Sequence, residues 1–352
     1  MGRRFEPVWA HLNNILKGKQ SPMNSSTHMF TTCNDDDFWD GLVSSSQQSN
    51  PFLKSSFLSS VERKDSRILL LEDGLPILGT CILSESLSQT QKESNLNLYQ
   101  GIFFPNLGNF SYRDENRRLK LMSILSDEIN KRHMGVSLSL HPEVIDTRGI
   151  EWFFYENRKA KVQPMIITKY TGVIRIASHD SFESYQHTIR KVRKQEIKKS
   201  LDLRMKIQEN TDRIEEFVML YEKTFSRQGI KLSNTDKDRV SRVIHSGISS
   251  KQGKLDIIYL PNGEPASGMY TLFDDKSDYY LYGATDPKHR STFGSSHLML
   301  NAIERTFLEN KTLFDFCGMN SPQRGEYKSS FNARVEPYFE VDFIPIRDVL
   351  GG

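Results

Sequence analysis

The sequence predicts an α/β (α+β) chain of two domains, each a mixed, mostly antiparallel sheet flanked by helices. Three observations lead to this fold class. The chain has 352 residues, more than one hydrophobic core usually organises. Apolar runs of strand length alternate with stretches of helical periodicity. The order of helices, β-meander, helix, strand, helix and strand occurs before Ser178 and again after it.

In the first half, each predicted element follows from a local pattern. Two short helices each have a suitable N-cap, which is Asp35 or Asp36 for the first helix and Asn50 for the second. Glu72–Gly74 is a hairpin signal between two apolar β runs, and apolar residues recur at helical spacing over Leu119–Ile129. The predicted helices are Asp36–Ser44, Pro51–Glu62, one through Leu119–Ile129, and one through Ile150–Tyr155. The predicted strands are Arg67–Leu71, Pro76–Leu83, Leu96–Phe104, Val136–Leu140 and Val162–Ile167.

The second half begins with a basic stretch, Phe182–Leu201, that we predict as one long helix. A further helix has its apolar face between Ile214 and Phe225. Polar turns at Asn262–Gly263 and Asp274–Asp275 separate three strands of a meander, and a helix starts at Gly294. The predicted strands are Leu203–Ile207, Leu255–Leu260, Ala266–Phe273, Tyr279–Ala284, Leu313–Gly318 and Pro337–Val341, with a short helix near Gly325–Asn332.

Composition limits the classes of function. The net charge of +3 is too small to indicate DNA binding by itself. Three cysteines without C-x-x-C spacing predict a reducing compartment and neither a disulfide framework nor a zinc site. No H-E-x-x-H, G-x-S-x-G, Walker or dinucleotide-binding pattern occurs, so we expect no metal and no tightly bound cofactor. No apolar run approaches the roughly 20 residues of a membrane span, which favours a cytoplasmic protein.

The N-terminal residues 1–28 are predicted to be an extension and linker. Residues 18–28 are polar and rich in helix breakers. The apolar residues of Phe5–Leu16 have helical spacing, which indicates a short docking helix or, as the alternative, a peripheral contact with the inner face of a membrane. We favour docking, because the polar face of this helix is not strongly basic.

Two constellations of the second half are candidates for binding anions. Arg190, Lys194 and Lys198 are four residues apart on one helix face, with Lys191, Arg193 and Lys199 beside them; such a run is either a solvated face or a polyphosphate site. Arg290 precedes a strand-to-helix turn with Gly294, Ser295 and Ser296, where unpaired N–H groups and the helix dipole favour a phosphate. The same turn is also compatible with an ordinary helix N-cap.

A third constellation surrounds Tyr327 and Lys328. A lysine among aromatic residues is a candidate for stabilising an oxyanion or a phosphate, although taken on its own a surface lysine is the favoured interpretation. Asp315, in an apolar strand, either orients a neighbour or contacts substrate, and it is a weak candidate for a general base, as is Asp286. For Cys317 we favour a packed thiol over a nucleophile.

These segments together resemble the FemAB-like acyltransferases of the GNAT superfamily, in particular the BioF2-like branch. The likeness lies in Tyr282–Ala284 with Asp286, Pro287 and Arg290, in Phe314–Gly318, and in Tyr327, Lys328 and Phe331 followed by Pro337–Phe339. It extends upstream to Thr188–Lys194 and Phe225–Gly229, and in the first half to His141–Pro142, Asp146–Arg148, Trp152 and Tyr155, and covers roughly residues 50–345.

The resemblance implies two tandem GNAT-like domains, here 29–175 and 176–352, with catalysis in the second. It implies an N-acyltransferase whose acceptor is an amine of an anionic cell-envelope precursor, such as an amino sugar or a nucleotide-linked or lipid-linked sugar. Acyl-CoA is favoured over aminoacyl-tRNA as donor, but the choice stays open. The Arg290 loop lacks regular glycine spacing, which weakens the case for coenzyme A, and no long helical arm follows the basic helix, which weakens the case for tRNA. The alternative is a non-catalytic module of this fold that binds RNA or another anionic polymer.

The residue patterns and the resemblance together give three groups of candidate site residues. Lys328, Tyr327 and Asp315 are the catalytic candidates. Arg290, Gly294, Ser295 and Ser296 are the candidates for the donor phosphates. The candidates for substrate contacts are Arg190, Lys191, Arg193, Lys194, Arg227, Tyr282, Asp286 and Tyr338.

Overall fold

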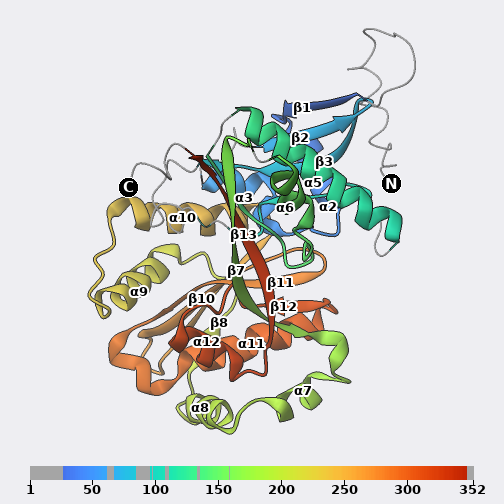
Figure 1. The fold of residues 1–352 in the computed structure, drawn as a ribbon. Helices are drawn as coiled ribbons and strands as arrows, with labels where there is room; N and C mark the ends of the chain where they lie inside the picture. The colour runs from blue at the N-terminus through green and yellow to red at the C-terminus, as the bar shows by residue number, and fades with distance from the viewer. Residues whose placement is uncertain are drawn as a thin grey trace, which may run out of the picture. The chain divides into compact units, whose positions relative to one another are not determined.

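The computed structural model describes residues 27–61, 67–84, 96, 98–107, 111–132, 135–157 and 159–346 (Figure 1). Most of the predicted extension, including Phe5–Leu16, lies outside these ranges. The described chain separates into two units. The first holds the residues up to Leu58, then Arg67–Ile167, and those from Phe339 onward. The second holds Ser59–Val61 and Thr168–Tyr338.

One sheet of the first unit is an antiparallel series of four strands in the order β1-β2-β3-β5. The predicted hairpin is confirmed, with Asp73 and Gly74 both at positive φ (50° and 83°) in the turn, which suits the twist of the flanking strands. The third predicted strand is shorter than expected. The bounds are β1 His28–Thr32, β2 Arg67–Glu72, β3 Leu75–Cys81 and β5 Ile102–Phe103.

A second group of strands in this unit brings together distant parts of the chain. β6 (Val136–Ser139) pairs antiparallel with β4 (Leu83–Ser84) and with residues 340–343 of β13 (Arg334–Pro345). Val341 and Phe343 therefore pack in the core of the first unit. Helix α5 (Tyr112–Arg132) contributes its predicted apolar face to the same core. The other helical elements are α2 Asp36–Ser44, η1 Pro51–Leu53, α3 Ser55–Ser60 and α6 Arg148–Glu156.

The second unit is built on a sheet with the strand order β7-β12-β11-β10-β9-β8. All neighbours are antiparallel except β11 and β12, which are parallel. The predicted meander is confirmed as β9 Gly253–Tyr259, β10 Pro265–Phe273 and β11 Ser277–Thr285. The remaining strands are β7 Val162–Arg175, β8 Lys206–Gln208 and β12 Leu313–Asp315. β7 and β13 each run from one unit into the other.

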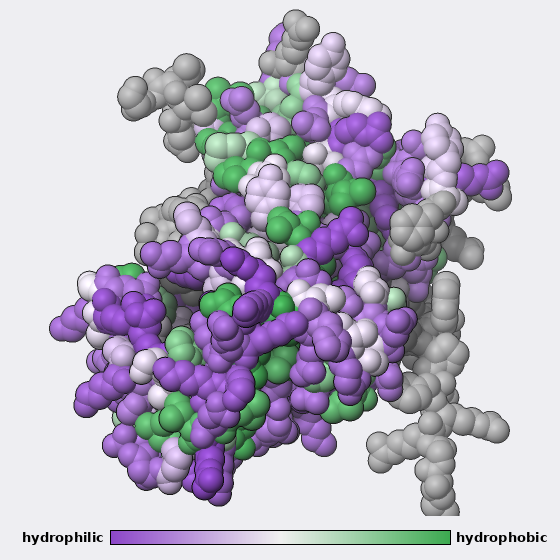
Figure 2. All heavy atoms as spheres, turned by 90° about the horizontal axis from the view of Figure 1, so that it is seen from below, coloured by the Kyte–Doolittle hydropathy of each residue, from purple (hydrophilic) through white to green (hydrophobic). Residues whose placement is uncertain are grey.

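Helices cover both faces of this sheet, which is why β10 is buried along most of its length. Gly268 and Tyr270 contact α9 (Ile214–Ser226) and α10 (Asn234–Ser249). Met269, which points to the other face, packs in a core with α11 (Gly294–Leu308). On the face seen in Figure 2, hydrophilic side chains predominate and hydrophobic ones gather in separate patches.

The prediction of one long basic helix is wrong. Phe182–Leu201 forms two helices, α7 (Phe182–Thr188) and α8 (Lys191–Asp202). Ile189 and Arg190 between them are extended, with ψ of 139° and 141°. Ile189 is buried in the core and the Arg190 N–H donates to the Ser330 carbonyl at 3.1 Å, so a tertiary contact replaces the helical bond.

No helix among the described residues combines the length and the apolar composition that crossing a membrane requires.

Candidate functional site: a cation-lined cavity in the second unit

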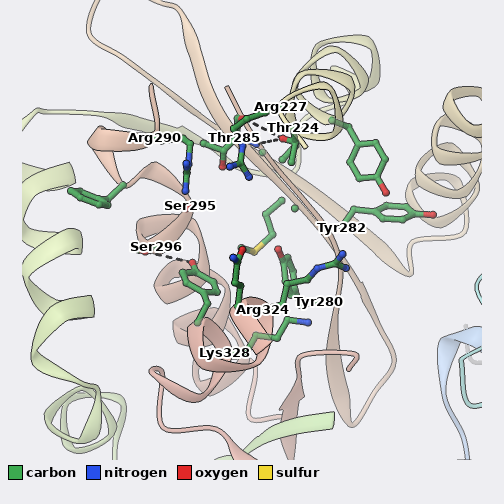
Figure 3. Close-up of a pocket in the computed structure, with 18 of the residues that line it drawn as sticks. Thr224, Arg227, Tyr280, Tyr282, Thr285, Arg290, Ser295, Ser296, Arg324 and Lys328 are labelled. Atoms are coloured by element: carbon green, nitrogen blue, oxygen red, sulfur yellow. Dashed lines mark hydrogen bonds between the residues drawn. The ribbon is translucent and has the colours of Figure 1, made fainter. Parts of the chain in front are cut away.

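A cavity of about 740 Å³ lies within the second unit, at the place where strands β11 and β12 part (Figure 3). Its wall comes from α8, α9, β10, β11, the turn before α11, and α12 Pro322–Ser329. In Figure 3, Ser296 lies on one side, Tyr282 on the other, and Lys328 on the α12 helix near the base. The polar and charged lining residues are Arg193, Glu196, Tyr221, Thr224, Arg227, Gln228, Tyr280, Tyr282, Thr285, Arg290, Ser291, Ser295, Ser296, Cys317, Gln323, Arg324, Tyr327 and Lys328.

The opening between β11 and β12 follows from their short pairing. The two strands pair only over Ser277–Tyr279 and Leu313–Asp315, although β11 continues to Thr285. A register shift opposite Tyr270 and Thr271 leaves Leu281 as the extra residue of β11, and such a bulge bends the strand. The segment 280–285 therefore lines the cavity instead of pairing with β12.

Lys328 is the most strongly perturbed cation of the site. Its side chain is buried, and Nζ donates to the carbonyl oxygens of Phe316 and Gly318, both at 2.6 Å. The ammonium also lies 5.3 Å from the centroid of the Tyr280 ring. Burial, which disfavours the charged form, lowers the pKa of Lys328 to about 8. The group is thus a desolvated ammonium whose pKa is lowered to about 8.

Tyr327 precedes Lys328 on α12 and packs between aromatic and cationic neighbours. Its ring contacts Phe331 edge to face, and the Arg193 guanidinium lies 5.0 Å from its centroid. Its hydroxyl is 3.5 Å from Ser296 Oγ, and burial raises the pKa of the phenol. The tyrosine therefore connects α12 to α8 and α11.

The start of α11 is shaped by two backbone features. Phe293 has positive φ (58°), and a Cβ added to Gly294 would lie 2.8 Å from Ile258 Cγ2. A glycine is therefore needed for the helix to begin this close to the sheet. Ser295 and Ser296 in the first turn line the cavity, and the Ser296 hydroxyl donates to Glu196 Oε2 at 2.6 Å.

The charge of the cavity wall is strongly positive. Five cationic side chains and a single carboxylate, that of Glu196, are among the lining residues: Arg193, Arg227, Arg290, Arg324 and Lys328 supply the positive charge. Arg193 pairs with Glu196, but the other cations face the cavity without a carboxylate in its wall. The arrangement favours an anionic ligand.

The structure brings together eight of the predicted site residues at this cavity. They are Lys328, Tyr327, Arg193, Arg227, Tyr282, Arg290, Ser295 and Ser296. The other predicted residues do not line it. These are Asp315, Gly294, Arg190, Lys191, Lys194, Asp286 and Tyr338.

Asp315 and Asp286 are held in local hydrogen bonds. Asp315 Oδ1 accepts from Thr171 Oγ1 at 2.5 Å and from the Cys317 N–H at 2.7 Å. Asp286 Oδ2 accepts from Lys223 Nζ at 2.7 Å, and its Oδ1 accepts from the N–H of Lys288 at the start of a 3₁₀ turn. Both carboxylates thus hold the backbone around the cavity rather than face into it.

Three predicted substrate contacts are exposed at the start of α8. Arg190, Lys191 and Lys194 do not line the cavity, and Lys194 Nζ donates to the His187 carbonyl. These side chains are mostly in solvent, which agrees with the alternative prediction that this run of charges is a solvated helix face. Tyr338 is buried in β13.

Sequence reasoning missed several members of the wall. Arg324 lies four residues before Lys328 on α12, a spacing that could have revealed it. Glu196 is the single acidic residue between Arg190 and Ser200, and nothing in the sequence marks it as part of a site. Tyr280, Thr224 and Thr285 carry no sequence signal; the hydroxyl of Thr224 donates to the Thr285 carbonyl at 3.0 Å.

Cys317 lines the cavity but is poorly suited to nucleophilic attack. Burial raises the pKa of its thiol well above the ordinary value. No histidine is among the cavity-lining residues of the described chain. The thiol therefore acts as part of the wall.

Comparison with known proteins identifies the domain that holds this cavity. Residues 183–329 match the family model of the acetyltransferase (GNAT) domain. Residues 183–329 of this chain are a GNAT acetyltransferase domain. The cavity lies entirely within the matched range. No curated protein sequence matches the chain at a significant level.

Solved structures extend the likeness in fold beyond this domain to nearly the whole chain. The crystal structure of FemX matches with a TM-score of 0.67 and 14% identity, over 92% of this chain and 99% of FemX. A conserved protein of unknown function from Bacteroides thetaiotaomicron matches with a TM-score of 0.54 and 10% identity, over 90% of this chain and 99% of that one. L-PGS from Bacillus licheniformis matches with a TM-score of 0.53 and 6% identity, over 88% and 92%. The predicted α/β fold class with two tandem GNAT-like domains, and the FemAB-like resemblance, are confirmed.

Proposed function

We propose that this GNAT acyltransferase moves an acyl group from a phosphate-bearing activated donor, with acyl-CoA the favoured donor, to an amine of an anionic acceptor. The observation that carries the proposal is the buried ammonium of Lys328 in a cavity lined by four arginines. Such a cavity combines attraction for anionic substrates with a fixed positive charge that little water screens.

The donor is proposed to lie along β11. The edge of β11 at residues 280–285 is not paired with β12, so its backbone groups are available to an extended chain that carries amides. The phosphates would then reach Arg290 and the first turn of α11, where Ser295 lines the cavity. Unpaired N–H groups and the dipole of this helix stabilise negative charge there.

Lys328 is proposed to stabilise the oxyanion that forms when the acceptor amine attacks the acyl carbonyl. Two carbonyl acceptors fix its Nζ, so no reorganisation is required as charge develops. Tyr327 packs beside it and positions α12 through its contacts with Arg193 and Ser296. The acyl carbonyl would therefore be bound between α12 and β11.

The acceptor is proposed to be a cell-envelope precursor, such as an amino sugar or a nucleotide-linked or lipid-linked sugar. Arg227 and Arg324 line the part of the cavity that the donor would leave free, and both suit phosphate or carboxylate groups. The FemAB-like resemblance implies such an acceptor and makes aminoacyl-tRNA the competing donor, and the likeness of the fold to FemX supports that resemblance.

The test supplies both donors to the wild-type protein with the same panel of amines. Acetyl-CoA and longer acyl-CoAs are followed by thiol release, and charged tRNA by loss of its labelled amino acid. Thiol release that depends on an amino sugar supports the proposal. Transfer from tRNA alone would assign the donor differently, and salt-dependent RNA binding without any transfer would leave the non-catalytic alternative.

A further inference from the structure

Glu196 is an exception in the cavity wall. It is the one carboxylate among the described lining residues. Without this carboxylate, the surrounding cations would attract a fully anionic substrate more strongly. A carboxylate kept in such a place is expected to meet a positive charge. Arg193 supplies part of that charge, since the two side chains form an ion pair and are 17% and 12% exposed.

The two oxygens of Glu196 have different surroundings. Oε2 accepts from Ser296 Oγ at 2.6 Å and from the Arg193 guanidinium. Oε1 has no hydrogen-bond partner among the described residues, and it is not among their enclosed unpaired polar atoms. Because Glu196 lines the cavity, Oε1 is an available acceptor on a side chain that is otherwise fixed at its other oxygen.

The position of Oε1 relates it to the reaction site. Ser296, which binds Oε2, also lies 3.5 Å from the Tyr327 hydroxyl, and Tyr327 is next to Lys328 in the chain. The carboxylate and the buried ammonium are therefore on the same wall of the cavity, formed where α8, α11 and α12 meet.

We propose that Glu196 Oε1 binds the ammonium group of the acceptor and takes one of its protons before the nitrogen attacks the acyl carbonyl. This inference rests on the proposed acyl transfer. It defines the acceptor as a molecule with a primary amine close to anionic groups, so that the amine meets Glu196 while the anionic groups meet the arginines.

The protons and bonds of this step balance. The ammonium gives one proton to Glu196 Oε1, from which it passes to solvent. The neutral nitrogen then forms its bond to the acyl carbon, and the carbonyl oxygen becomes the oxyanion. When the oxyanion collapses, the bond to the donor sulfur or oxygen breaks, and the second nitrogen proton goes to that leaving group.

The experiment measures binding without a donor, so that it does not depend on turnover. Two pairs of probes differ only in an amine or a hydroxyl: glucosamine 6-phosphate with glucose 6-phosphate, and phosphoethanolamine with 2-hydroxyethyl phosphate. In calorimetric titrations of the wild-type protein we expect the amine of at least one pair to bind about tenfold more tightly, the scale of one charge-assisted hydrogen bond. Glu196→Gln should remove this preference, and Glu196→Asp should reduce it.

Asp202→Asn is the matched control, because Asp202 is an exposed carboxylate of the same helix that pairs with Lys198. This variant should keep the wild-type preference. No preference for the amine in either pair, or an equal preference in Glu196→Gln, overturns the inference. Acyl transfer is measured separately: an intact amine preference without any transfer contradicts the proposed function alone, whereas transfer with an unchanged acceptor KM in Glu196→Gln contradicts only the role of Glu196.

Discussion

The hydroxyl of Thr171 donates to Asp315 Oδ1 at 2.5 Å and accepts from the N–H of Gly318 at 3.1 Å. These two bonds hold the turn that follows β12. The carbonyls of Phe316 and Gly318 in this turn are the acceptors of Lys328 Nζ. A buried pair outside the cavity wall thus fixes the groups that position the ammonium inside it.

Thr171→Val should therefore destabilise the second unit. Valine keeps the shape of threonine but leaves the buried Asp315 carboxylate and the Gly318 N–H with one partner fewer, which costs about 1–3 kcal/mol. Urea unfolding measures the change. Thr312→Val removes an exposed hydroxyl bond and should change stability by less than about 0.5 kcal/mol. Equal losses in the two variants would contradict the role of the Thr171–Asp315 bond.

Lys328→Met should reduce kcat about 100-fold, the usual effect of removing one group that stabilises an oxyanion. The methionine fills much of the same volume, so the loss would be chemical rather than structural. Steady-state rates and a thermal unfolding curve, recorded on the same sample, separate the two causes. The control is Lys206→Met, at an exposed position of β8. If kcat of Lys328→Met stays within twofold of wild type, Lys328 has no catalytic role.

The rate should also decrease above pH 8. Burial lowers the pKa of Lys328 to about 8, so the side chain is an ammonium below this pH and loses its charge as the pH rises through it. The charges of Asp315 and Arg324 act on the same group. We expect the ratio of wild-type kcat to that of Lys328→Arg to fall through this range, because arginine stays protonated. If this ratio is constant from pH 7 to pH 9.5, titration of Lys328 is not the cause of the decrease in rate.

Arg290→Ala should raise the donor KM about tenfold with little change in kcat. Arg290 is exposed at the turn before α11, so in the proposed function it would bind donor phosphates without contacting the reacting carbonyl. Initial rates at two salt concentrations should also show a weaker dependence on salt in this variant. Arg204→Ala, at an exposed position outside the cavity wall, provides the comparison. An equal effect of both variants would indicate general rather than local attraction.

Gly283→Ala tests the geometry around Lys328 without changing a charge. A Cβ at Gly283 would lie 1.9 Å from the hydroxyl of Tyr280, so the phenol must move, and Lys328 packs over that ring. We expect kcat to fall several-fold. The same substitution at Gly41, where a Cβ meets nothing within 4 Å, should leave kcat unchanged. Wild-type kcat in Gly283→Ala would show that the Tyr280 ring does not position the ammonium.

Local patterns predicted most elements of the fold. The bounds of α2 agree with the prediction at both ends, because Asp35 caps the helix through its side chain. The meander agrees because its turns carry polar breakers. The break at Ile189 and Arg190 has no glycine or proline to mark it, and the contact of Arg190 with Ser330 that produces it spans 140 residues of sequence. Helix α10 was not predicted; its apolar residues alternate with many charged ones.

The candidate site was predictable where residues of one kind cluster in the sequence. Lys328 with Tyr327, and Arg290 with Ser295 and Ser296, are neighbours in the chain and also in the cavity. Asp315 was predicted as a site residue because it is polar within an apolar strand. This pattern indicates that the carboxylate needs a partner, but not on which side of the strand the partner lies. Its partner, Thr171, comes from another strand, a relationship that only the fold reveals.

The return of β13 to the first unit has a consequence for biosynthesis. Val341 and Phe343 complete the core that begins with Leu70 and Ile77. A ribosome must therefore make the entire second unit before the first can close its core. Until then the N-terminal part of the nascent chain would expose apolar surface for longer than a contiguous domain would, a period in which a chaperone could bind it.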